Sequence, residues 1–344
     1  MLPLKDACPL RYTHADDSGY TRVKKGRGFA YVDDKKRFIR DKQTLDRIKS
    51  LVIPPAWTNV WITSYSNGHL QATGIDSKGR KQYLYHPLWN ELREKNKIEN
   101  ILAFGKALPK LRKHIQRDLK KHKLGKEKVT ALALNIMEDT LIRAGSIQYR
   151  KQNNSYGLTT LRTKHVQING QVVFFKFVGK KGKEHQIKLS DRSLAKRLRQ
   201  VMELPGQEVF QYYNEKGERC KLDSGDLNEY IHQHTKQHFT TKDFRTWYAT
   251  FFAFSYLIQP QNNSESTIAY KQNLNKCLDF VAKKLGNTRA VCKASYVCGE
   301  LMDTYQLNGL QPFVKKWKVK SVEALEKSQI EKLLLTFLAN LKRP

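Results

Sequence analysis

The spacing of apolar and polar positions changes near residue 92. Before that point, short apolar runs separated by turn residues predict strands in FAYVDD (29–34), KRFI (36–39) and KQYLYH (81–86). The two prolines of LVIPPAW (51–57) exclude a helix there, because proline lacks the backbone N–H that a helix interior needs. Residues 1–92 are therefore predicted to form a small β-rich domain.

Beyond residue 92 the apolar positions follow a helical period. Leu108, Leu111, Ile115 and Leu119 recur at intervals of three and four residues, which places them on one helix face. Similar patterns predict helices at 191–204, 243–258 and 268–285, and a last helix with one apolar side. That side carries Ile330, Leu333, Leu334, Phe337, Leu338 and Leu341, and the aromatic run of Trp247, Tyr248, Phe251, Phe252 and Phe254 is interpreted as helix packing.

One segment, 165–190, interrupts these helices. It contains Asn169-Gly170, a dipeptide that favours hairpin turns, and a second turn signal from Gly179 to Gly182. Three antiparallel strands are expected there. The chain is thus predicted to have an α+β fold, with a β-rich N-terminal domain (1–92) and a larger, mainly helical domain (93–344) that embeds a three-stranded antiparallel sheet.

Charge narrows the possible functions. The 344 residues include 63 Lys and Arg against 32 Asp and Glu, a formal net charge of +31. Positive charges in such excess repel one another in a folded protein, so they usually indicate a polyanionic partner. Nucleic acid is the leading candidate, and an anionic membrane surface is the second. Residues 106–128 alone carry ten basic and two acidic side chains. This run is typical either of a solvated helix face or, as we favour, of a helix that faces phosphates.

Other classes of protein have weaker support. The longest apolar run, 247–258, is shorter than the roughly 18 residues of a membrane span, and the first residues lack the pattern of a secretory signal. Five cysteines occur without any C-x-x-C spacing, which indicates free thiols in a reduced cytoplasmic protein. The histidines of IHQHTKQH (231–238) have no companion cluster and are interpreted as a polar helix face rather than a metal site.

Four segments place a cation or an amide beside turn or helix-end signals. They are LIRAGS with Arg143, FVGKKGKEH with Lys180, TKDFRTW with Lys242 and Arg245, and LGNTRAVCKASY with Asn287 and Tyr296. Each alone is more typical of a surface cation, a helix cap or, for Tyr296, a tyrosine of the core.

Together, however, these segments resemble the type IB DNA topoisomerases in their compact, poxvirus-like and bacterial form. IPPAWTNVWI and GHLQATGIDSKGRKQYLYH carry the resemblance in the N-terminal part. IRAG, SYGLTTLRTKHV, FVGKKGKEHQI, KDFRTW and LGNTRAVCKASY carry it in the C-terminal part, in the family's order. The resemblance covers nearly the whole chain.

The resemblance implies both a reaction and a partner. The expected partner is double-stranded DNA, and the expected activity is relaxation of positive and negative supercoils. One strand is cleaved through a 3′-phosphotyrosyl intermediate, the nicked duplex rotates, and the strand is religated without ATP, a divalent metal or any other cofactor. The resemblance also implies a monomer that encircles the duplex, located in the cytoplasm at the bacterial nucleoid.

The family's catalytic residues correspond to positions of this chain. Tyr296 matches the nucleophile, Arg143 and Arg245 match two arginines that hold the non-bridging phosphoryl oxygens, and Lys180 matches the lysine that protonates the leaving 5′-oxygen. A phenol of pKa about 10 is mostly protonated at neutral pH, so nearby cations are needed to favour the phenolate. Planar guanidinium groups match the equatorial phosphoryl oxygens of the transition state.

Two of these assignments leave alternatives open. Asn287 stands where the poxvirus enzymes have a histidine, and bacterial members resemble this chain in having an asparagine there. A carboxamide can donate a hydrogen bond but cannot change its protonation state. The alternative interpretation of Asn287 is a helix C-cap after Gly286. Lys181 or Lys183 could take the role assigned to Lys180.

A strand in the N-terminal part, SKGRKQYLYH (77–86), implies a second set of DNA contacts. In the resembling enzymes this strand contacts DNA in the major groove, where Gln and Arg can read base edges. The residues expected to bind DNA are Lys78, Arg80, Gln82, Tyr83 and Tyr85, together with Lys242. The alternative for the two tyrosines, which share one face of the strand, is a place in the core.

Two other functions are compatible with parts of the pattern. A tyrosine recombinase uses a related Arg–Lys–Arg–Tyr set, but usually carries H-x-x-R where this chain has Lys242 and Arg245. A non-enzymatic DNA-binding protein on the same scaffold would be expected to lose Tyr296 or an arginine, and all are present.

Overall fold

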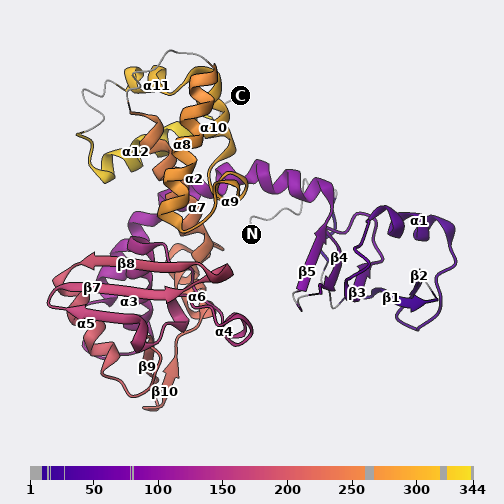
Figure 1. The fold of residues 1–344 in the computed structure, drawn as a ribbon, viewed down its shortest axis with the longest axis horizontal. Coiled ribbons are helices and arrows are strands. Elements are labelled where there is room, and N and C mark those ends of the chain that lie inside the picture. The colour runs from indigo at the N-terminus through magenta and orange to yellow at the C-terminus, as the bar shows by residue number, and fades with distance from the viewer. Residues whose placement is uncertain are drawn as a thin grey trace. The chain divides into compact units, whose positions relative to one another are not determined.

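A five-stranded antiparallel sheet fills the first part of the chain. Its order is β2-β1-β3-β4-β5, built from β1 (Gly19–Lys25), β2 (Gly28–Val32), β3 (Thr58–Thr63), β4 (Leu70–Ile75) and β5 (Lys81–Tyr85). The sheet belongs to the first of two compact units, Met1–Lys97, and Ile98–Pro344 forms the second (Figure 1). The computed structural model describes residues 10–341 except 14, 16, 27, 78, 80, 260–266 and 318–323.

The strand prediction for the first unit is partly wrong. KRFI forms no strand, and its Phe38 makes only an isolated bridge to Val32. The other two predicted strands correspond to β2 and β5. The segment 51–57 is free of helix, as its prolines predict, and Arg22 fastens this loop by donating hydrogen bonds to the carbonyl oxygens of Ile53 (3.3 Å) and Pro54 (3.1 Å).

The first unit also contains a helix that the apolar pattern does not predict, α1 (Lys42–Ser50). Ile48 is its one buried residue, so the helix has no apolar stripe to read from the sequence. The Asp41 side chain caps the helix by accepting a hydrogen bond of 2.8 Å from the Thr44 N–H. Ile48 then packs with Val60 and Ile62 in the small core of this unit.

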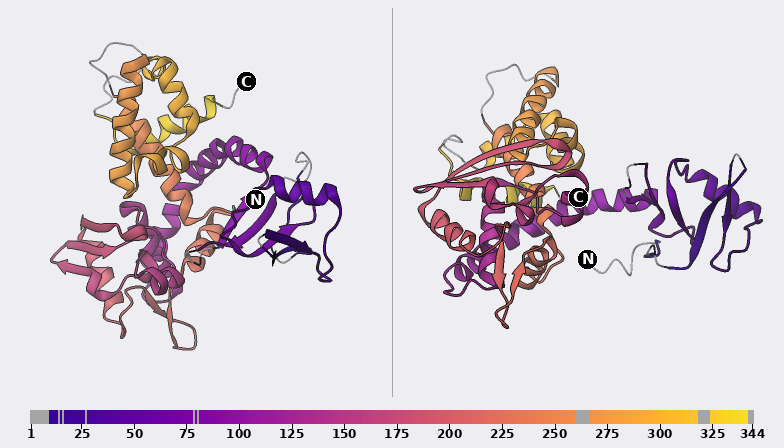
Figure 2. Two further views of the ribbon diagram at one scale, coloured as in Figure 1. Left: turned by 45° about the vertical axis from the view of Figure 1, so that its right-hand side comes forward. Right: turned by 60° about the horizontal axis from the view of Figure 1, so that its bottom comes forward.

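The second unit is mainly helical. Helix α2 (Pro87–Asp118) leads into it, and the remaining helices are α3 (Lys126–Thr140), α4 (Ile147–Asn153), α5 (Arg192–Met202), α6 (Ser224–Thr235), α7 (Thr241–Leu257), α8 (Thr267–Leu285), α9 (Arg289–Ser295), α10 (Gly299–Asn308), α11 (Gln311–Lys316) and α12 (Lys327–Asn340). In Figure 1 and the left view of Figure 2, α8, α10, α11 and α12 lie at one end of this unit. Helix α5 and a three-stranded sheet lie at the other end.

The embedded sheet is confirmed. Strands β6 (Val166–Asn169), β7 (Val172–Val178) and β8 (Glu184–Ser190) pair antiparallel in the order β6-β7-β8. The turn between β7 and β8 contains a short 3-10 segment, Lys180–Gly182. A two-stranded ribbon of β9 (Gln211–Tyr213) and β10 (Arg219–Lys221) was not predicted, because its three-residue strands are too short to show a period.

The apolar face predicted for α2 is confirmed, since Leu108, Leu111, Ile115 and Leu119 are all buried. The aromatic residues of α7 also pack in the main core, as predicted. No helix in the described part of the chain is long and apolar enough to cross a membrane.

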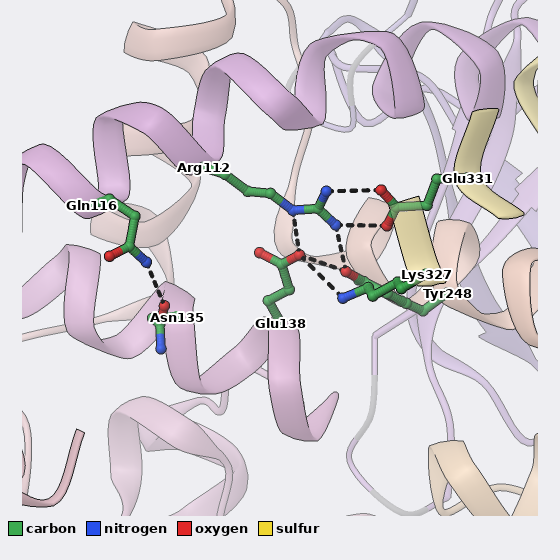
Figure 3. A network of polar contacts seen from close by, with 7 residues as sticks. All are labelled: Arg112, Gln116, Asn135, Glu138, Tyr248, Lys327 and Glu331. Carbon is green, nitrogen blue, oxygen red and sulfur yellow. Dashed lines mark hydrogen bonds and ion pairs between the residues drawn. The ribbon is translucent and has the colours of Figure 1, made fainter. Parts of the chain in front are cut away.

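A buried network of charges ties four helices together (Figure 3). Arg112 of α2 donates hydrogen bonds to Glu138 of α3 (2.6 Å), to both carboxylate oxygens of Glu331 of α12 (2.7 and 2.8 Å) and to the Tyr248 hydroxyl of α7 (2.8 Å). Burial tends to lower the pKa of Arg112, but the two carboxylates outweigh it and raise the pKa. This guanidinium therefore stays charged, and four of its five N–H donors are used by these partners.

We predict that Arg112→Met destabilises the protein, by about 3–5 kcal/mol, because it leaves the largely buried Glu331 carboxylate without its cation and Glu138 with only the more distant Lys327 (3.8 Å). The measurement is the free energy of unfolding in guanidinium chloride. Lys113→Met is the matched control, since Lys113 is an exposed neighbour on the same helix and its loss should change stability by less than about 0.5 kcal/mol. Equal stability of the two variants would contradict a structural role for the network.

Candidate active site

Tyr296 directly follows α9 and caps its end. Its N–H donates a hydrogen bond of 3.1 Å to the Cys292 carbonyl oxygen. The Thr250 hydroxyl of α7 fixes the segment, because it donates to the Tyr296 carbonyl oxygen (3.4 Å) and accepts from the Cys298 N–H (3.2 Å). The Tyr296 side chain is half-buried, so it is neither a surface residue nor enclosed in the core.

Arg245 of α7 lies against Tyr296. Its side chain is buried, with a relative exposure of 4%, and its guanidinium carbon lies 5.2 Å from the centre of the Tyr296 ring. The guanidinium donates to the carbonyl oxygen of Leu141, which follows α3, and to that of Leu285, the last residue of α8 (2.8 Å). These carbonyls have no partner within their own helices, so a single side chain joins two helix ends beside the tyrosine.

Arg143 and Asn287, each two residues beyond a carbonyl that Arg245 binds, contact each other. Arg143 lies in the loop after α3, and its carbonyl oxygen accepts a hydrogen bond of 2.8 Å from the Leu158 N–H. The Arg143 guanidinium donates to the side-chain oxygen of Asn287. The Asn287 N–H donates to the Ala282 carbonyl oxygen (2.9 Å) and so closes the end of α8. The cap is made by the backbone, which leaves the carboxamide free for Arg143.

Two buried N–H donors at this site have no hydrogen-bond partner of normal geometry. They are Nε of Arg245 and Nδ2 of Asn287. The Cys292 thiol adjoins the Asn287 amide, but a thiol sulfur is only a weak acceptor. Buried donors are rarely left unpaired in folded proteins, so these two N–H groups are available to a further acceptor.

The lysines of the β7–β8 turn lie beside this cluster. The ammonium nitrogen of Lys180 is 5.6 Å from the centre of the Tyr149 ring, and that of Lys183 donates to the Asn287 carbonyl oxygen (3.4 Å). Lys180 and Arg143 line the same pocket of about 150 Å³. The structure thus brings Lys180 to Arg143 and, in addition, brings Lys183 to Asn287.

The cations act on the phenol of Tyr296. Burial tends to raise its pKa, but the charge and hydrogen bond of Arg245 and the charges of Arg143 and Lys242 outweigh burial and lower the pKa. Burial and the neighbouring Arg143 lower the pKa of Arg245. Within the described residues, no ion pair joins these cations to a carboxylate. The site therefore combines a phenol of lowered pKa with cations that make no ion pair to a carboxylate within the described residues.

The predicted DNA-binding residues of the first unit lie on β5, except for Lys78 and Arg80, which fall outside the described residues. Tyr83 has a relative exposure of 49%, and its ring stacks on that of Tyr85 at 6.2 Å. The interpretation of Tyr83 as a core residue is therefore wrong. Gln82 donates a hydrogen bond of 2.8 Å to the Asp76 carboxylate, which holds its amide in place on the strand.

Sequence reasoning missed His185, which lines the same pocket as Arg143 and Lys180. It lies on β8, where His185, Ile187 and Leu189 alternate with exposed residues. That period of two was visible in the sequence and would have placed the histidine on the inner face.

Comparison with known proteins identifies the class. Residues 86–321 match the family model of the eukaryotic DNA topoisomerase I catalytic core, and residues 28–76 match that of the bacterial DNA topoisomerase IB N-terminal domain. The chain belongs to the type IB DNA topoisomerase family and is an enzyme of that class.

Its relatives include viral enzymes of similar length. The chain is 35% identical to DNA topoisomerase 1B of Acanthamoeba polyphaga mimivirus over 297 residues, which cover 84% of this chain and 88% of that protein. It is 25% identical to DNA topoisomerase I of Monkeypox virus over 232 residues, covering 67% of this chain and 70% of that protein. A solved structure of the XerH site-specific recombinase bound to its difH substrate matches 68% of this chain and 59% of that one, at 14% identity and a TM-score of only 0.33.

We predict that Lys242→Gln raises the pKa of Tyr296 toward the ordinary value of about 10, because it removes one of the cations that favour the phenolate. The measurement is a pH titration of ring-labelled tyrosine by NMR, with Tyr296→Phe used to assign the signal. Lys276→Gln, an exposed lysine of α8, makes the same change of net charge and should leave the titration unaltered. If the two lysine variants titrate alike, the local electrostatic explanation is wrong.

Proposed function

We propose that this enzyme relaxes positive and negative supercoils in double-stranded DNA by cutting and resealing one strand through Tyr296. The observation that carries this proposal is the half-buried phenol whose pKa is lowered by two guanidiniums and an ammonium. A phosphodiester is an anion, and the uncompensated charge around Tyr296 suits it.

In the cleavage step, the ionised Tyr296 oxygen attacks a backbone phosphorus and the bond to the 5′-oxygen breaks. Charge builds on the non-bridging oxygens, and Arg143, Arg245 and the Asn287 amide stabilise it. The unpaired donors of Arg245 and Asn287 support this assignment, since both can donate to phosphoryl oxygens without first breaking a protein hydrogen bond of normal geometry. The product is a 3′-phosphotyrosyl bond.

The leaving 5′-oxygen is a strong base and needs a proton. A lysine of the β7–β8 turn supplies it, and we assign Lys180 because it shares the pocket with Arg143. Lys183 is the competing donor, held at the Asn287 carbonyl oxygen. In the reverse step the lysine takes this proton back from the 5′-hydroxyl, whose oxygen attacks the phosphorus, and the bond from phosphorus to the Tyr296 oxygen breaks.

Between the two steps the nicked duplex rotates and loses supercoils. The energy of the broken phosphodiester is kept in the phosphotyrosyl bond, so ATP is not required. The proposed chemistry uses only side chains of this protein, which acts as a monomer encircling the duplex. The residues of β5 are proposed to contact the DNA outside the cleavage site, and Lys242 is proposed to contact it close to Tyr296, whose pKa it lowers.

We predict that the purified protein relaxes both negatively and positively supercoiled plasmid in EDTA without ATP. Tyr296→Phe should bind DNA with affinity close to that of the unchanged protein but form no covalent adduct, because it lacks the nucleophilic oxygen. Agarose gels measure relaxation, and denaturing gels with end-labelled DNA measure the adduct. A covalent adduct in Tyr296→Phe would move the nucleophile to another residue.

We further predict that Lys180→Ala slows cleavage of normal DNA by about 10²–10⁴-fold, the usual contribution of a general acid. A substrate with sulfur in place of the bridging 5′-oxygen should restore most of the rate, since a thiolate leaves without a proton. Lys183→Ala is the matched variant, and it should show neither the large loss nor the selective rescue. The reverse result would assign the proton to Lys183, and absence of rescue in both would remove general-acid catalysis from this turn.

A further inference from the structure

The ring of His185 lies between two segments of the active site. His185 is on β8, directly opposite Phe177 of β7, and the two rings stack at 4.9 Å with an angle of 10° between their planes. Phe177 is part of the buried core. The imidazole thus stacks on a ring that is itself packed in the core.

Two glycines flank this ring. A Cβ added at Gly179 would lie 2.8 Å from Cδ2 and Nε2 of His185, and one added at Gly286 would lie 2.7 Å from its Cε1. Both distances are shorter than real carbon contacts allow, so the imidazole touches both backbones directly. Gly179 immediately precedes Lys180, and Gly286 immediately precedes Asn287.

Burial and the surrounding cations both favour the neutral form of His185. Burial, followed by the charges of Arg143, Arg245 and Lys183, lowers its pKa to about 4. Lys180 lines the same pocket. An imidazolium here would add another positive charge to a cluster that already lacks carboxylates. The imidazole ring is therefore an uncharged, flat spacer near neutral pH.

We propose that His185 is a positioning residue: its ring sets the distance between the Gly179–Lys180 turn and the Gly286–Asn287 turn, and so aligns the proton donor with the amide that binds the phosphoryl oxygen. This inference rests on the proposed function. Through this contact, the ring holds the β7–β8 turn and the segment that follows α8 at a fixed distance from each other, on either side of the proposed phosphate position.

The alternative role for His185 is direct proton transfer. If His185 transfers a proton, its titration should appear in the pH dependence of the cleavage rate. If the ring only positions the two turns, His185 should contribute no titration between pH 6 and 9. The two roles also differ in the response to Gly179. The backbone of Gly179 has an ordinary φ of −97°, so alanine there brings no backbone strain. Its Cβ would clash with the imidazole alone, because the other near atom, the Lys183 carbonyl oxygen, lies at an ordinary contact distance of 3.5 Å.

The experiment is a double-mutant cycle of His185→Ala and Gly179→Ala, read as the single-turnover rate of covalent adduct formation with saturating enzyme. Each single variant should lose about 10- to 100-fold, the usual effect of misplacing a catalytic group by a fraction of an ångström to one ångström. Because both act on one contact, the double variant should lose little more than either single variant. DNA affinity and the shape of the pH profile should stay as in the unchanged protein.

Two matched controls keep general destabilisation apart from misplacement. Gly299→Ala adds a methyl group at a helical glycine with open space around it, and His234→Ala removes another half-buried, stacked histidine, which lies against His114 at 4.3 Å. Both should cleave at a rate within about threefold of the unchanged protein. His185→Phe, which keeps a neutral ring, should recover part of the rate lost in His185→Ala.

Three outcomes would overturn the inference. Losses that multiply in the double variant would show that the two residues act independently. A limb of the pH profile that disappears in His185→Ala would assign His185 to proton transfer, and unchanged rates in both single variants would show that the contact is not needed. None of these affects the proposed function, which fails instead if the unchanged protein forms no adduct through Tyr296.

Discussion

The active site depends on one buried guanidinium that joins two helix ends. Arg245 donates to the carbonyl oxygens of Leu141 and Leu285, where α3 and α8 end. Such carbonyls carry the negative end of the helix dipole and have no partners inside their helices. Arg143 comes two residues after the first anchor and Asn287 two residues after the second. A single side chain therefore fixes the starting point of both segments that are proposed to hold the phosphate.

Arg112 and Arg245 have opposite environments. Arg112 is surrounded by Glu138 and Glu331, so its charge is neutralised and its role is structural (Figure 3). Arg245 has backbone carbonyls and a tyrosine as partners, and the repulsion of Arg143 lowers its pKa. Carbonyl groups orient a guanidinium without cancelling its charge. Such an environment leaves the positive charge available to an anion, which suits the proposed phosphate site.

Sequence patterns predicted the parts of the fold that carry a long period or a specific turn. The α2 stripe, the α7 aromatic face and the Asn169-Gly170 hairpin all follow from side-chain spacing. Helix α1 and the β9–β10 ribbon did not, because they bury too few residues to leave a pattern. The candidate site is assembled from segments whose proximity is a matter of tertiary packing. The family resemblance predicted the residues of the site, but only the three-dimensional structure shows that Lys183 contacts Asn287 and that His185 contacts the preceding Gly286.

The asparagine at position 287 follows from the same electrostatics. Its side-chain oxygen accepts a hydrogen bond from Arg143 while its amide keeps a donor without a normal partner. An imidazolium has two donors and no acceptor, so it would lose the bond to Arg143. It would also add positive charge next to Arg143 and Lys183. A carboxamide supplies the acceptor and the donor at once, at any pH, and the neutral ring of His185 holds the turn that presents it.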